Sequence, residues 1–320
     1  MINQISSRDR QSMLADIAEM YFLEGKTQSE IAAVVGVTRS NISRMLTEAR
    51  NNGIVLIQIN RPLKENHKLS QQLIDRFGLI NARVVSLSKS TNPLSSLGKA
   101  AGIELISRLQ QGWIIGTSWG TAISSTVEEI DKFTSINGIK VVQLLGAQGA
   151  RIDQYDAHAI VRRLAEKLDA EGVYLNAPFL VEDQRTAVSL LSNKSISNTL
   201  NIGKNANIAL LGVGSSDPEH SSYYLADYVN QEDMVAIHQA GAIGDVCGRF
   251  YDLNGNMTAF EFQNRLIGIS SKDLMHIPIR IGVAGGSAKV EPIIGALRNH
   301  LINILISDEK TIIDVLEKSK

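Results

Sequence analysis

The chain has 320 residues, of which 44% are apolar, 20% are charged and 5% are aromatic, and its formal net charge is −1. This composition is typical of a soluble globular protein, and the length allows about two domains. No apolar run approaches the roughly 18 residues that a membrane helix needs. The single cysteine, Cys247, excludes an intrachain disulfide and a cysteine-rich metal site. The N-terminus lacks the apolar core of a signal peptide, so we expect a cytoplasmic protein.

The balance of charge does not by itself indicate a nucleic-acid partner. Residues 1–62 carry seven Lys and Arg residues against six Asp and Glu residues, and the rest of the chain carries 25 against 27. Contacts with DNA would therefore depend on where individual charges are placed. A nearly neutral DNA-binding unit would bind modestly as one copy, so we expect such a protein to act as a dimer or a larger assembly.

The N-terminal part of the chain predicts three helices in succession. The apolar spacing favours a first helix over residues 9–24. Thr27 and Glu30 form the sequence signature of a capping box at the start of a second, short helix. Gly36 marks a sharp turn, because glycine tolerates a positive φ, and Thr38 is then a good N-cap for a third helix. This spacing predicts a helix-turn-helix unit.

The third predicted helix has two contrasting faces. Its apolar residues recur at i, i+3, i+4 and i+7 and form one core-facing stripe, which consists of Ile42, Met45, Leu46 and Ala49. The opposite face is small, polar and cationic, which suits a helix that enters the major groove of DNA. The predicted DNA-binding residues are Thr38, Arg39, Ser40, Asn41, Ser43, Arg44 and Thr47. The alternatives are an ordinary helical hairpin with a solvated face and a protein-docking domain of similar shape.

A domain boundary follows this unit. Residues 54–60 are compatible with a wing-like strand, and Pro62 marks the end of the unit. We therefore expect an all-α, possibly winged, helix-turn-helix domain over residues 1–61 and a second domain over residues 62–320. The second domain begins with a predicted helix over residues 63–77. Docking of this helix onto its own chain and a dimer-forming role are equally compatible with its apolar seam.

Short apolar runs alternate with helix-like segments from residue 81 onward. Continuous apolar strands separated by helices predict a parallel sheet that is covered by helices on both faces. The strand candidates are residues 82–87, 113–118, 139–146, 172–178, 206–214, 277–285 and 301–306. The helices expected between them include residues 95–111, 121–133, 155–170 and 289–300. In such sheets, ligands bind outside the carboxyl ends of the strands.

Three of the strand candidates end in glycine-rich loops, over residues 116–121, 212–217 and 282–289. Glycines allow close approach of the backbone, and the N-terminus of a following helix favours an anion. Each loop alone is weak evidence for a site, because such turns occur in every α/β protein. Three loops at the same edge of one sheet would be much better evidence. None of them fits the dinucleotide fingerprint or the P-loop, and we expect no cofactor.

A fourth glycine-rich stretch, residues 241–252, contains Asp245. An acidic residue between glycines can accept hydrogen bonds from neighbouring sugar hydroxyls. The spacing supports equally well a carboxylate that merely caps a turn. The histidines are scattered without metal-ligand spacing, so we expect no metal ion.

Four stretches, in order and in spacing, carry a resemblance to a known family. They are residues 21–55, 114–122, 241–252 and 282–297. Through them the chain resembles the SorC-type transcriptional regulators of bacterial carbohydrate operons over essentially its whole length. The resemblance implies a Rossmann-like C-terminal α/β domain, similar to sugar-phosphate isomerases and CoA transferases, that is used as a sensor. It also implies a phosphorylated sugar or sugar alcohol as effector, and a homo-oligomer that is commonly a tetramer.

The resemblance further implies which residues bind the effector. Asp245 would hold its hydroxyls, and Lys289 would contact its phosphate or a nearby oxygen. Some related regulators form a Schiff base on a lysine that follows the strand at residues 139–146, but this chain has no lysine there. We therefore expect a non-covalent effector that Gln148 contacts through hydrogen bonds. The expected effector-binding residues are Gly116, Thr117, Ser118, Trp119, Gly120, Thr121, Gln148, Ser215, Asp245 and Lys289.

Two other functions compete with operon regulation. A sugar-phosphate isomerase-like enzyme with a fused DNA-binding domain would need a base beside the reacting carbon, and the sequence shows no convincing acid/base pair. A purely structural DNA-bending protein would not need a large α/β domain. We therefore predict a regulator of a carbohydrate or sugar-alcohol catabolic operon, with operator DNA and the effector as partners. We expect no catalytic residues and no membrane association.

Overall fold

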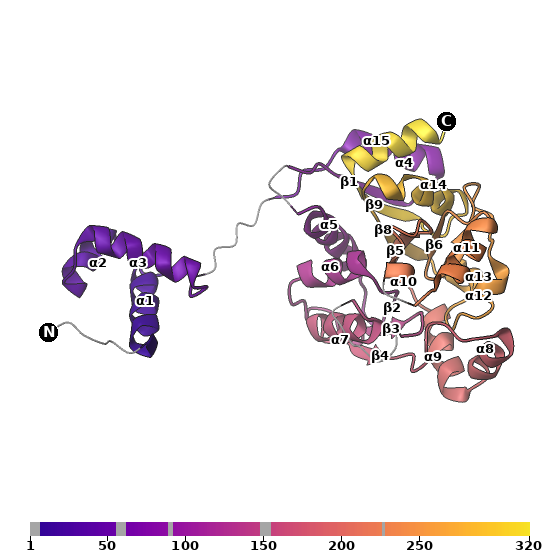
Figure 1. The fold of residues 1–320 in the computed structure, drawn as a ribbon, viewed down its shortest axis with the longest axis horizontal. Helices are drawn as coiled ribbons and strands as arrows, with labels where there is room; N and C mark the ends of the chain where they lie inside the picture. Colours follow the sequence, from indigo (N-terminus) through magenta and orange to yellow (C-terminus); the bar gives the residue numbers. More distant parts are fainter. Residues whose placement is uncertain (1–6, 56–61, 89–91, 148–154, 226–227) are drawn as a thin grey trace. The chain divides into compact units, whose positions relative to one another are not determined.

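The computed structural model describes residues 7–55, 62–88, 92–147, 155–225 and 228–320. The chain divides into two compact units, Met1–Pro62 and Leu63–Lys320 (Figure 1). Among the described residues, no helix is long and apolar enough to cross a membrane. Most of the run that suggested a wing-like strand, residues 56–60, lies outside the described residues.

The N-terminal unit forms the predicted helix-turn-helix arrangement. Its helices in the described part are α1 Ser7–Phe22, α2 Gln28–Val35 and α3 Arg39–Asn51. The capping box is present, because Thr27 Oγ1 accepts a hydrogen bond from the Glu30 N–H at 3.3 Å and a Glu30 carboxylate oxygen accepts one from the Thr27 N–H at 2.8 Å. Gly36 ends α2 with a φ of 74°, and Thr38 caps α3. The predicted stripe of α3 is buried against Leu14, Ile17 and Ile31.

The C-terminal unit is built on the predicted parallel sheet. Its strands are β1 Asn81–Val85, β2 Ile114–Thr117, β3 Lys140–Gln143, β4 Glu171–Val173, β5 Ile208–Ser215, β8 Ile279–Val283 and β9 Ile304–Asp308. They lie in the order β1-β9-β8-β5-β2-β3-β4, and each neighbouring pair is parallel. The central strands β2, β5 and β8 are therefore adjacent, so their carboxyl ends meet at one edge.

Helices cover both faces of this sheet, as Figure 1 shows. They are α4 His67–Phe77, α5 Pro93–Arg108, α6 Thr121–Glu129, α7 Ala157–Leu168, α8 Gln184–Leu191, α9 Lys194–Lys204, α10 Ser222–Leu225, α11 Gln231–Gln239, α12 Phe260–Gln263, α13 Ser271–His276, α14 Val290–Arg298 and α15 Glu309–Lys318. Helices α5, α6 and α7 lie together on one side of the sheet, and α9, α11 and α14 lie on the other. A short 3-10 helix, Ser287–Lys289, precedes α14.

Several predicted bounds are wrong for local reasons. The helix predicted over residues 63–77 begins only at His67, because Glu65 makes an antiparallel bridge with Val85 before Asn66 caps α4. The strand predicted over residues 172–178 ends at Val173. Lys289, predicted to begin a helix, lies in the 3-10 turn before α14.

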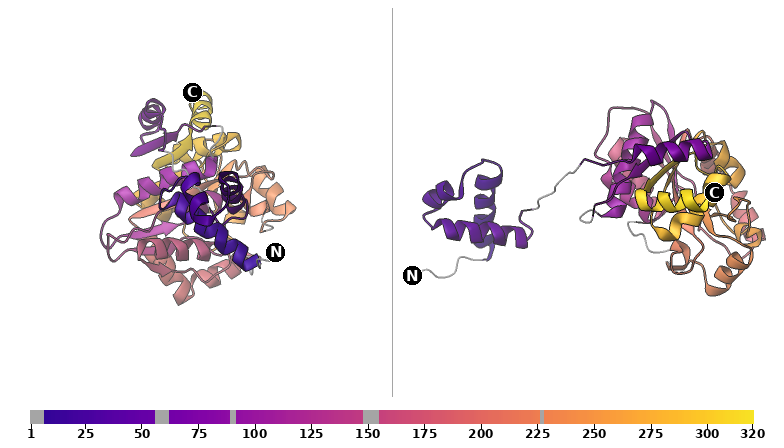
Figure 2. Two further views of the ribbon diagram at one scale, coloured as in Figure 1. Left: turned by 90° about the vertical axis from the view of Figure 1, so that its left-hand side faces the viewer. Right: turned by 90° about the horizontal axis from the view of Figure 1, so that it is seen from above.

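Helix α4 docks onto its own chain, which is one of the two predicted alternatives. Its Leu73 is fully buried in the core of the C-terminal unit. Arg76 Nη1 donates a hydrogen bond to the Leu316 carbonyl of α15 at 2.5 Å. Figure 2 shows purple α4 and yellow α15 side by side. The pair of helices therefore closes the β1 edge of the unit.

A pair of short strands was not predicted. Strands β6 Gly244–Val246 and β7 Arg249–Tyr251 form a hairpin, and β6 pairs antiparallel with the end of β5. Gly214 of β5 lies opposite Asp245 in this pairing. The hairpin thus carries the stretch 241–252 to the edge of the sheet where the glycine-rich loops lie.

The end of β9 holds two parts of the unit that are far apart in sequence. Asp308 Oδ2 accepts a hydrogen bond at 3.0 Å from the N–H of Gly286, in the loop after β8. The next residue, Glu309, accepts one at 2.5 Å from Asn66 Nδ2, near the start of the unit. The N–H of Asn66 also donates to the Val84 carbonyl. This strand end is therefore a shared support for the loop after β8 and for the first residues of the unit.

Candidate functional site

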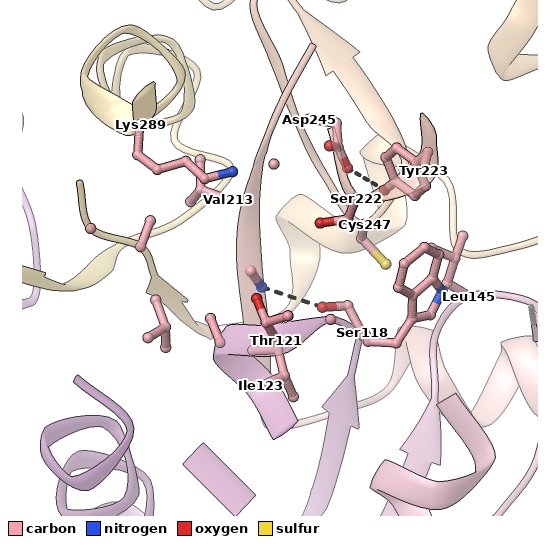
Figure 3. Close-up of a pocket in the computed structure, with 18 of the residues that line it drawn as sticks. Ser118, Thr121, Ile123, Leu145, Val213, Ser222, Tyr223, Asp245, Cys247 and Lys289 are labelled. Carbon is pink, nitrogen blue, oxygen red and sulfur yellow. Dashed lines mark hydrogen bonds between the residues drawn. The ribbon is translucent and has the colours of Figure 1, made fainter. Parts of the chain in front are cut away.

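A solvent-open cleft with about 680 Å³ of empty space lies at the carboxyl ends of β2, β5 and β8 (Figure 3). The three glycine-rich loops predicted from the sequence all contribute to it, because the strands that carry them are adjacent. The cleft also takes residues from α10 and from the β6–β7 hairpin. Its lining is Leu94, Ser118, Trp119, Gly120, Thr121, Ala122, Ile123, Leu145, Gly212, Val213, Gly214, Ser222, Tyr223, Asp245, Cys247, Val283, Ala284, Gly285 and Lys289.

The loop predicted over residues 116–121 has two parts. Its first two residues belong to β2, and the other four line the cleft. Ser118, Trp119, Gly120 and Thr121 line the cleft. Gly120, with a φ of 121°, stands immediately before α6 and gives that helix no side-chain cap. The first N–H groups of α6 are thus left for a ligand, and the helix dipole favours a negative charge there.

Gly116 and Thr117 are not among the residues that line the cleft. Both belong to β2, and a Cβ on Gly116 would lie 2.8 Å from Leu144 Cδ1, so this glycine serves core packing. Thr117 is fully buried, and its hydroxyl donates to the Ser118 carbonyl. Ser118 Oγ instead accepts a hydrogen bond from the Gly212 N–H at 3.3 Å and joins the loop after β2 to β5.

Asp245 is 2% exposed and uses only one of its two carboxylate oxygens within the protein. Oδ2 accepts hydrogen bonds from the Tyr223 hydroxyl at 2.5 Å and from the Gly248 N–H at 2.9 Å. Oδ1 is buried and has no hydrogen-bond partner. One oxygen therefore caps the hairpin turn, and the other has no partner within the protein. Burial raises the pKa of this carboxyl, against the opposing effects of Tyr223 and Gly248.

Lys289 places the opposite charge in the same cleft. Figure 3 shows its amino group directed into the cleft from the start of α14. Burial lowers the pKa of this amine, and the charge of Asp245 acts against that shift. Within the described part of the chain, the ammonium makes no hydrogen bond or ion pair. The cleft thus holds a cation and a carboxylate oxygen that each lack a partner, which is costly unless a ligand supplies one.

One other predicted residue, Ser215, does not line the cleft. Ser215 is buried in β5, and its hydroxyl accepts a hydrogen bond from the Asp217 N–H at 3.2 Å, beside a separate surface hollow. Gln148 lies outside the described residues. Across those residues, no group of three or more His, Cys, Asp or Glu side chains could hold a metal ion.

Sequence reasoning predicted Trp119 but missed Tyr223, the second aromatic residue that lines the cleft. Tyr223 stacks on Phe179 with ring centroids 4.9 Å apart, and Trp119 packs edge-on against Tyr223 at 5.1 Å. This packing fixes the ring whose hydroxyl holds Asp245. The sequence carries only a weak signal for it, the aromatic pair Tyr223-Tyr224 shortly after the loop that follows β5.

The polar face of α3 is the second candidate site. The predicted DNA-binding residues Thr38, Arg39, Ser40, Asn41, Ser43, Arg44 and Thr47 are all exposed. Thr38 Oγ1 is used as the cap of α3, where it accepts from the Asn41 N–H. Glu48, one helical turn after Arg44, pairs with Arg10 of α1 instead. Arg44 has no ion-pair partner among the described residues, so its guanidinium is available to DNA.

Comparison with known proteins finds matches to both parts of the chain. The family model of a sugar-binding domain (Sugar-bind) matches residues 61–317, and the model of sigma-70 region 4 matches residues 14–52. The chain is 30% identical to the sorbitol operon regulator of Klebsiella pneumoniae, over 93% of this chain and 96% of that protein. It is 31% identical to the deoxyribonucleoside regulator of Bacillus subtilis, over 95% of this chain and 97% of that protein.

Solved structures show the same relationship. The crystal structure of the full-length sorbitol operon regulator SorC from Klebsiella pneumoniae superposes with a TM-score of 0.73 at 29% identity, over 96% of this chain and 99% of that chain. A transcriptional regulator from Streptococcus pneumoniae superposes with a TM-score of 0.74 at 26% identity, over 79% of this chain and 97% of that chain. The chain therefore belongs to the SorC family of transcriptional regulators, with a sugar-binding domain behind a DNA-binding helix-turn-helix unit.

Proposed function

We propose that this regulator controls a carbohydrate or sugar-alcohol catabolic operon in response to a phosphorylated sugar or polyol that binds in the cleft of the C-terminal unit. The effector shifts a homo-oligomer, which we expect to be a tetramer, between states that bind the operator and states that do not. A ligand achieves this only through different affinities for the two states.

The observation that carries this proposal is the pair of unpartnered groups in one cleft. Lys289 supplies a positive charge, and the uncapped N-terminus of α6 supplies N–H donors, which together suit a phosphate. Asp245 Oδ1 needs a hydrogen-bond donor, which a sugar hydroxyl provides. A phosphate beside Asp245 would be repelled, so the effector is expected to turn its hydroxyls toward Asp245 and its phosphate toward Lys289.

Operator binding is assigned to α3. Its exposed face carries two arginines among short hydroxyl and amide side chains, which allows close approach to the major groove. The match of residues 14–52 to sigma-70 region 4 supports this assignment.

A sugar-phosphate isomerase is the second candidate function. Burial moves the pKa of Asp245 up and that of Lys289 down, and such opposed shifts are common in catalytic pairs. Sensing is favoured because the fused helix-turn-helix unit has no use in an isomerase. Incubation of the protein with ketose and aldose phosphates, with product analysis by NMR, distinguishes the two.

The decisive experiment is a thermal-shift screen of sugar and polyol phosphates, each beside its unphosphorylated counterpart. At a ligand concentration 100 times the dissociation constant, binding stabilises a protein by about 2.7 kcal/mol, which is enough for a clear shift. Ligands that pass the screen are then tested for release of the full-length protein from DNA of its own promoter region. A neutral sugar that acts as well as its phosphate would overturn the proposed effector class.

A further inference from the structure

Cys247 has a backbone conformation that cysteine rarely adopts. It and Gly248 form the two-residue loop between β6 and β7, where Val246 pairs directly with Arg249. Both loop residues have positive φ, 54° at Cys247 and 72° at Gly248. This is the pattern of a type I′ turn, in which Asn, Asp or Gly is strongly preferred at the first position. The turn alone therefore gives no reason for a cysteine.

The side chain of Cys247 points into the cleft. It is 3% exposed and belongs to the cleft lining together with Asp245 and Leu145. Figure 3 shows its sulfur between Asp245 and Leu145. Burial raises the pKa of the thiol to about 12, so it is almost entirely protonated at physiological pH and reacts only slowly as a nucleophile. In this state a cysteine behaves as a small, mostly apolar side chain that forms part of the cleft wall.

An independent observation indicates that a ligand group comes close to this wall. Asp245, two residues earlier, is 2% exposed and its Oδ1 has no partner. Its other oxygen accepts from the N–H of Gly248, in the same turn. The turn thus fixes the carboxylate and the thiol together. A ligand hydroxyl that donates to Oδ1 therefore lies in the same cleft that the Cys247 side chain lines.

We propose that Cys247 is a specificity-determining residue, whose side chain limits the size of the hydroxyl-bearing end of the effector. The inference rests on the proposed function of the cleft. A longer carbon chain would collide with the Cys247 side chain, and a shorter one would leave a gap beside it. Discrimination by one methylene group in an apolar pocket is about 10-fold to 200-fold.

The test measures affinities of polyol and sugar phosphates with three to seven carbons, by titration calorimetry on the full-length protein. The variants are Cys247→Ala, which shortens the side chain and keeps the Cβ, and Cys247→Gly, which also relieves the positive φ. Both variants should shift the ranking toward longer ligands, by about tenfold or more relative to the best ligand of the wild type. Asp169→Gly and His300→Gly are matched controls, because both residues are exposed, have φ of 51° and 53°, and lie outside the cleft.

The inference is overturned if Cys247→Ala leaves the order of ligand affinities unchanged. It is also overturned if only Cys247→Gly changes that order, because such an effect comes from the relieved backbone conformation. A second measurement needs no variant, because Cys247 is the only cysteine of the chain. Methyl methanethiosulfonate transfers its thiomethyl group to this thiolate, with methanesulfinate as the leaving group and the thiol proton lost to solvent.

The best ligand should slow this labelling at least tenfold, as followed by mass spectrometry. Labelling at the same rate with and without that ligand overturns the inference, whatever the variants do. A wild type that binds no member of the panel, although it still binds its promoter DNA, overturns the proposed effector class and the inference with it. If the wild type binds members of the panel but the variants or the labelling give a contradicting result, only the role of Cys247 is overturned and the proposed effector class stands.

Discussion

Arg10 of α1 holds Glu48 of α3 through two hydrogen bonds, one of 2.6 Å from Nη2 to Oε2 and one of 3.2 Å from Nε to Oε1. Glu48 is four residues after Arg44, a spacing at which it would otherwise pair with Arg44 on the same helix. The contact between α1 and α3 therefore keeps this acidic neighbour of Arg44 occupied. The pair is solvent-exposed, so it contributes little to stability, and its consequence is for the DNA-binding face.

Arg10→Ala should accordingly weaken operator binding with almost no change in Tm. The freed carboxylate of Glu48 would attract Arg44 and repel phosphates. Fluorescence anisotropy with operator DNA at 150 mM salt measures the loss. The double variant with Glu48→Gln should recover most of it. A double variant that binds as poorly as Arg10→Ala would show instead that Arg10 contacts DNA itself.

Arg44→Ala should also weaken operator binding. If Arg44 binds a guanine edge, about 1–3 kcal/mol of discrimination is lost at that base pair. If it contacts only phosphate, affinity falls similarly on all sequences. Competition binding with single-base operator variants separates the two. Arg50→Ala is the matched control, because it removes the same charge from the exposed surface of α3 outside the predicted set. Equal losses in both variants would mean that only overall charge matters.

Lys289→Ala and Asp245→Asn should fail in different ways. The first should lose the preference for phosphorylated over plain sugar, because the positive charge of the cleft is gone. The second should weaken recognition of hydroxyls while the phosphate is still preferred. Calorimetry with both forms of one sugar gives the two preferences, and Lys310→Ala, an exposed lysine outside the cleft, is the control. The assignment fails if both variants respond to the effector as the wild type does.

Gly214→Ala should disable the effector response while operator binding remains. A Cβ at Gly214 would lie 1.8 Å from Asp245 Oδ1, so the carboxylate must move and strain its bond with Tyr223. Such overpacking costs about 1–3 kcal/mol of stability. Gly212→Ala is the control for stability, because the nearest atom to its new Cβ would be 4.0 Å away. Chemical denaturation measures the free energy of unfolding of both variants, and equal values would contradict the expected overlap between the new Cβ and Asp245 Oδ1.

The effector-free protein should become less stable as pH rises above about 4, relative to Asp245→Asn. Burial raises the pKa of Asp245 above its ordinary value of 3.8, so the folded protein holds this proton more tightly than the unfolded chain. The resulting stability is present below the unfolded pKa and is lost as pH rises through the folded pKa. Effector hydroxyls favour the ionised carboxylate, so affinity should rise over the same interval. Thermal unfolding of both proteins is measured across this pH range. A difference in Tm between them that does not change with pH would refute the prediction.

The sequence was most informative where the signal is local or follows from topology. Thr27, Gly36 and Thr38 act within one helical turn, so their caps and turn could be predicted without the rest of the molecule. The parallel sheet predicted that the three glycine-rich loops lie at the same edge. The strand order, which the sequence did not give, made them neighbours. The β6–β7 hairpin could not be predicted, because three-residue strands among glycines have no hydrophobic alternation.

The details of the cleft depended on contacts that the sequence does not contain. The hydrogen bond from Tyr223 to Asp245 joins residues 22 positions apart on different elements. Gly116 and Thr117 were predicted with the loop after β2, but the strand continues through them and buries them in the core. Ser215 shares a sequence motif with glycines that line the cleft, and its hydroxyl is nevertheless bound within its own turn.

The end of β9 shortens the distance between two parts of the molecule in a mechanical sense. Gly286 and Asn66 are 220 positions apart along the chain, yet they hang from the consecutive residues Asp308 and Glu309. Gly286 and Asn66 are thus linked through two hydrogen bonds and the single peptide unit between Asp308 and Glu309. A ligand that displaces the loop after β8 would therefore act on Asn66, near the start of the C-terminal unit, through side-chain hydrogen bonds within that unit.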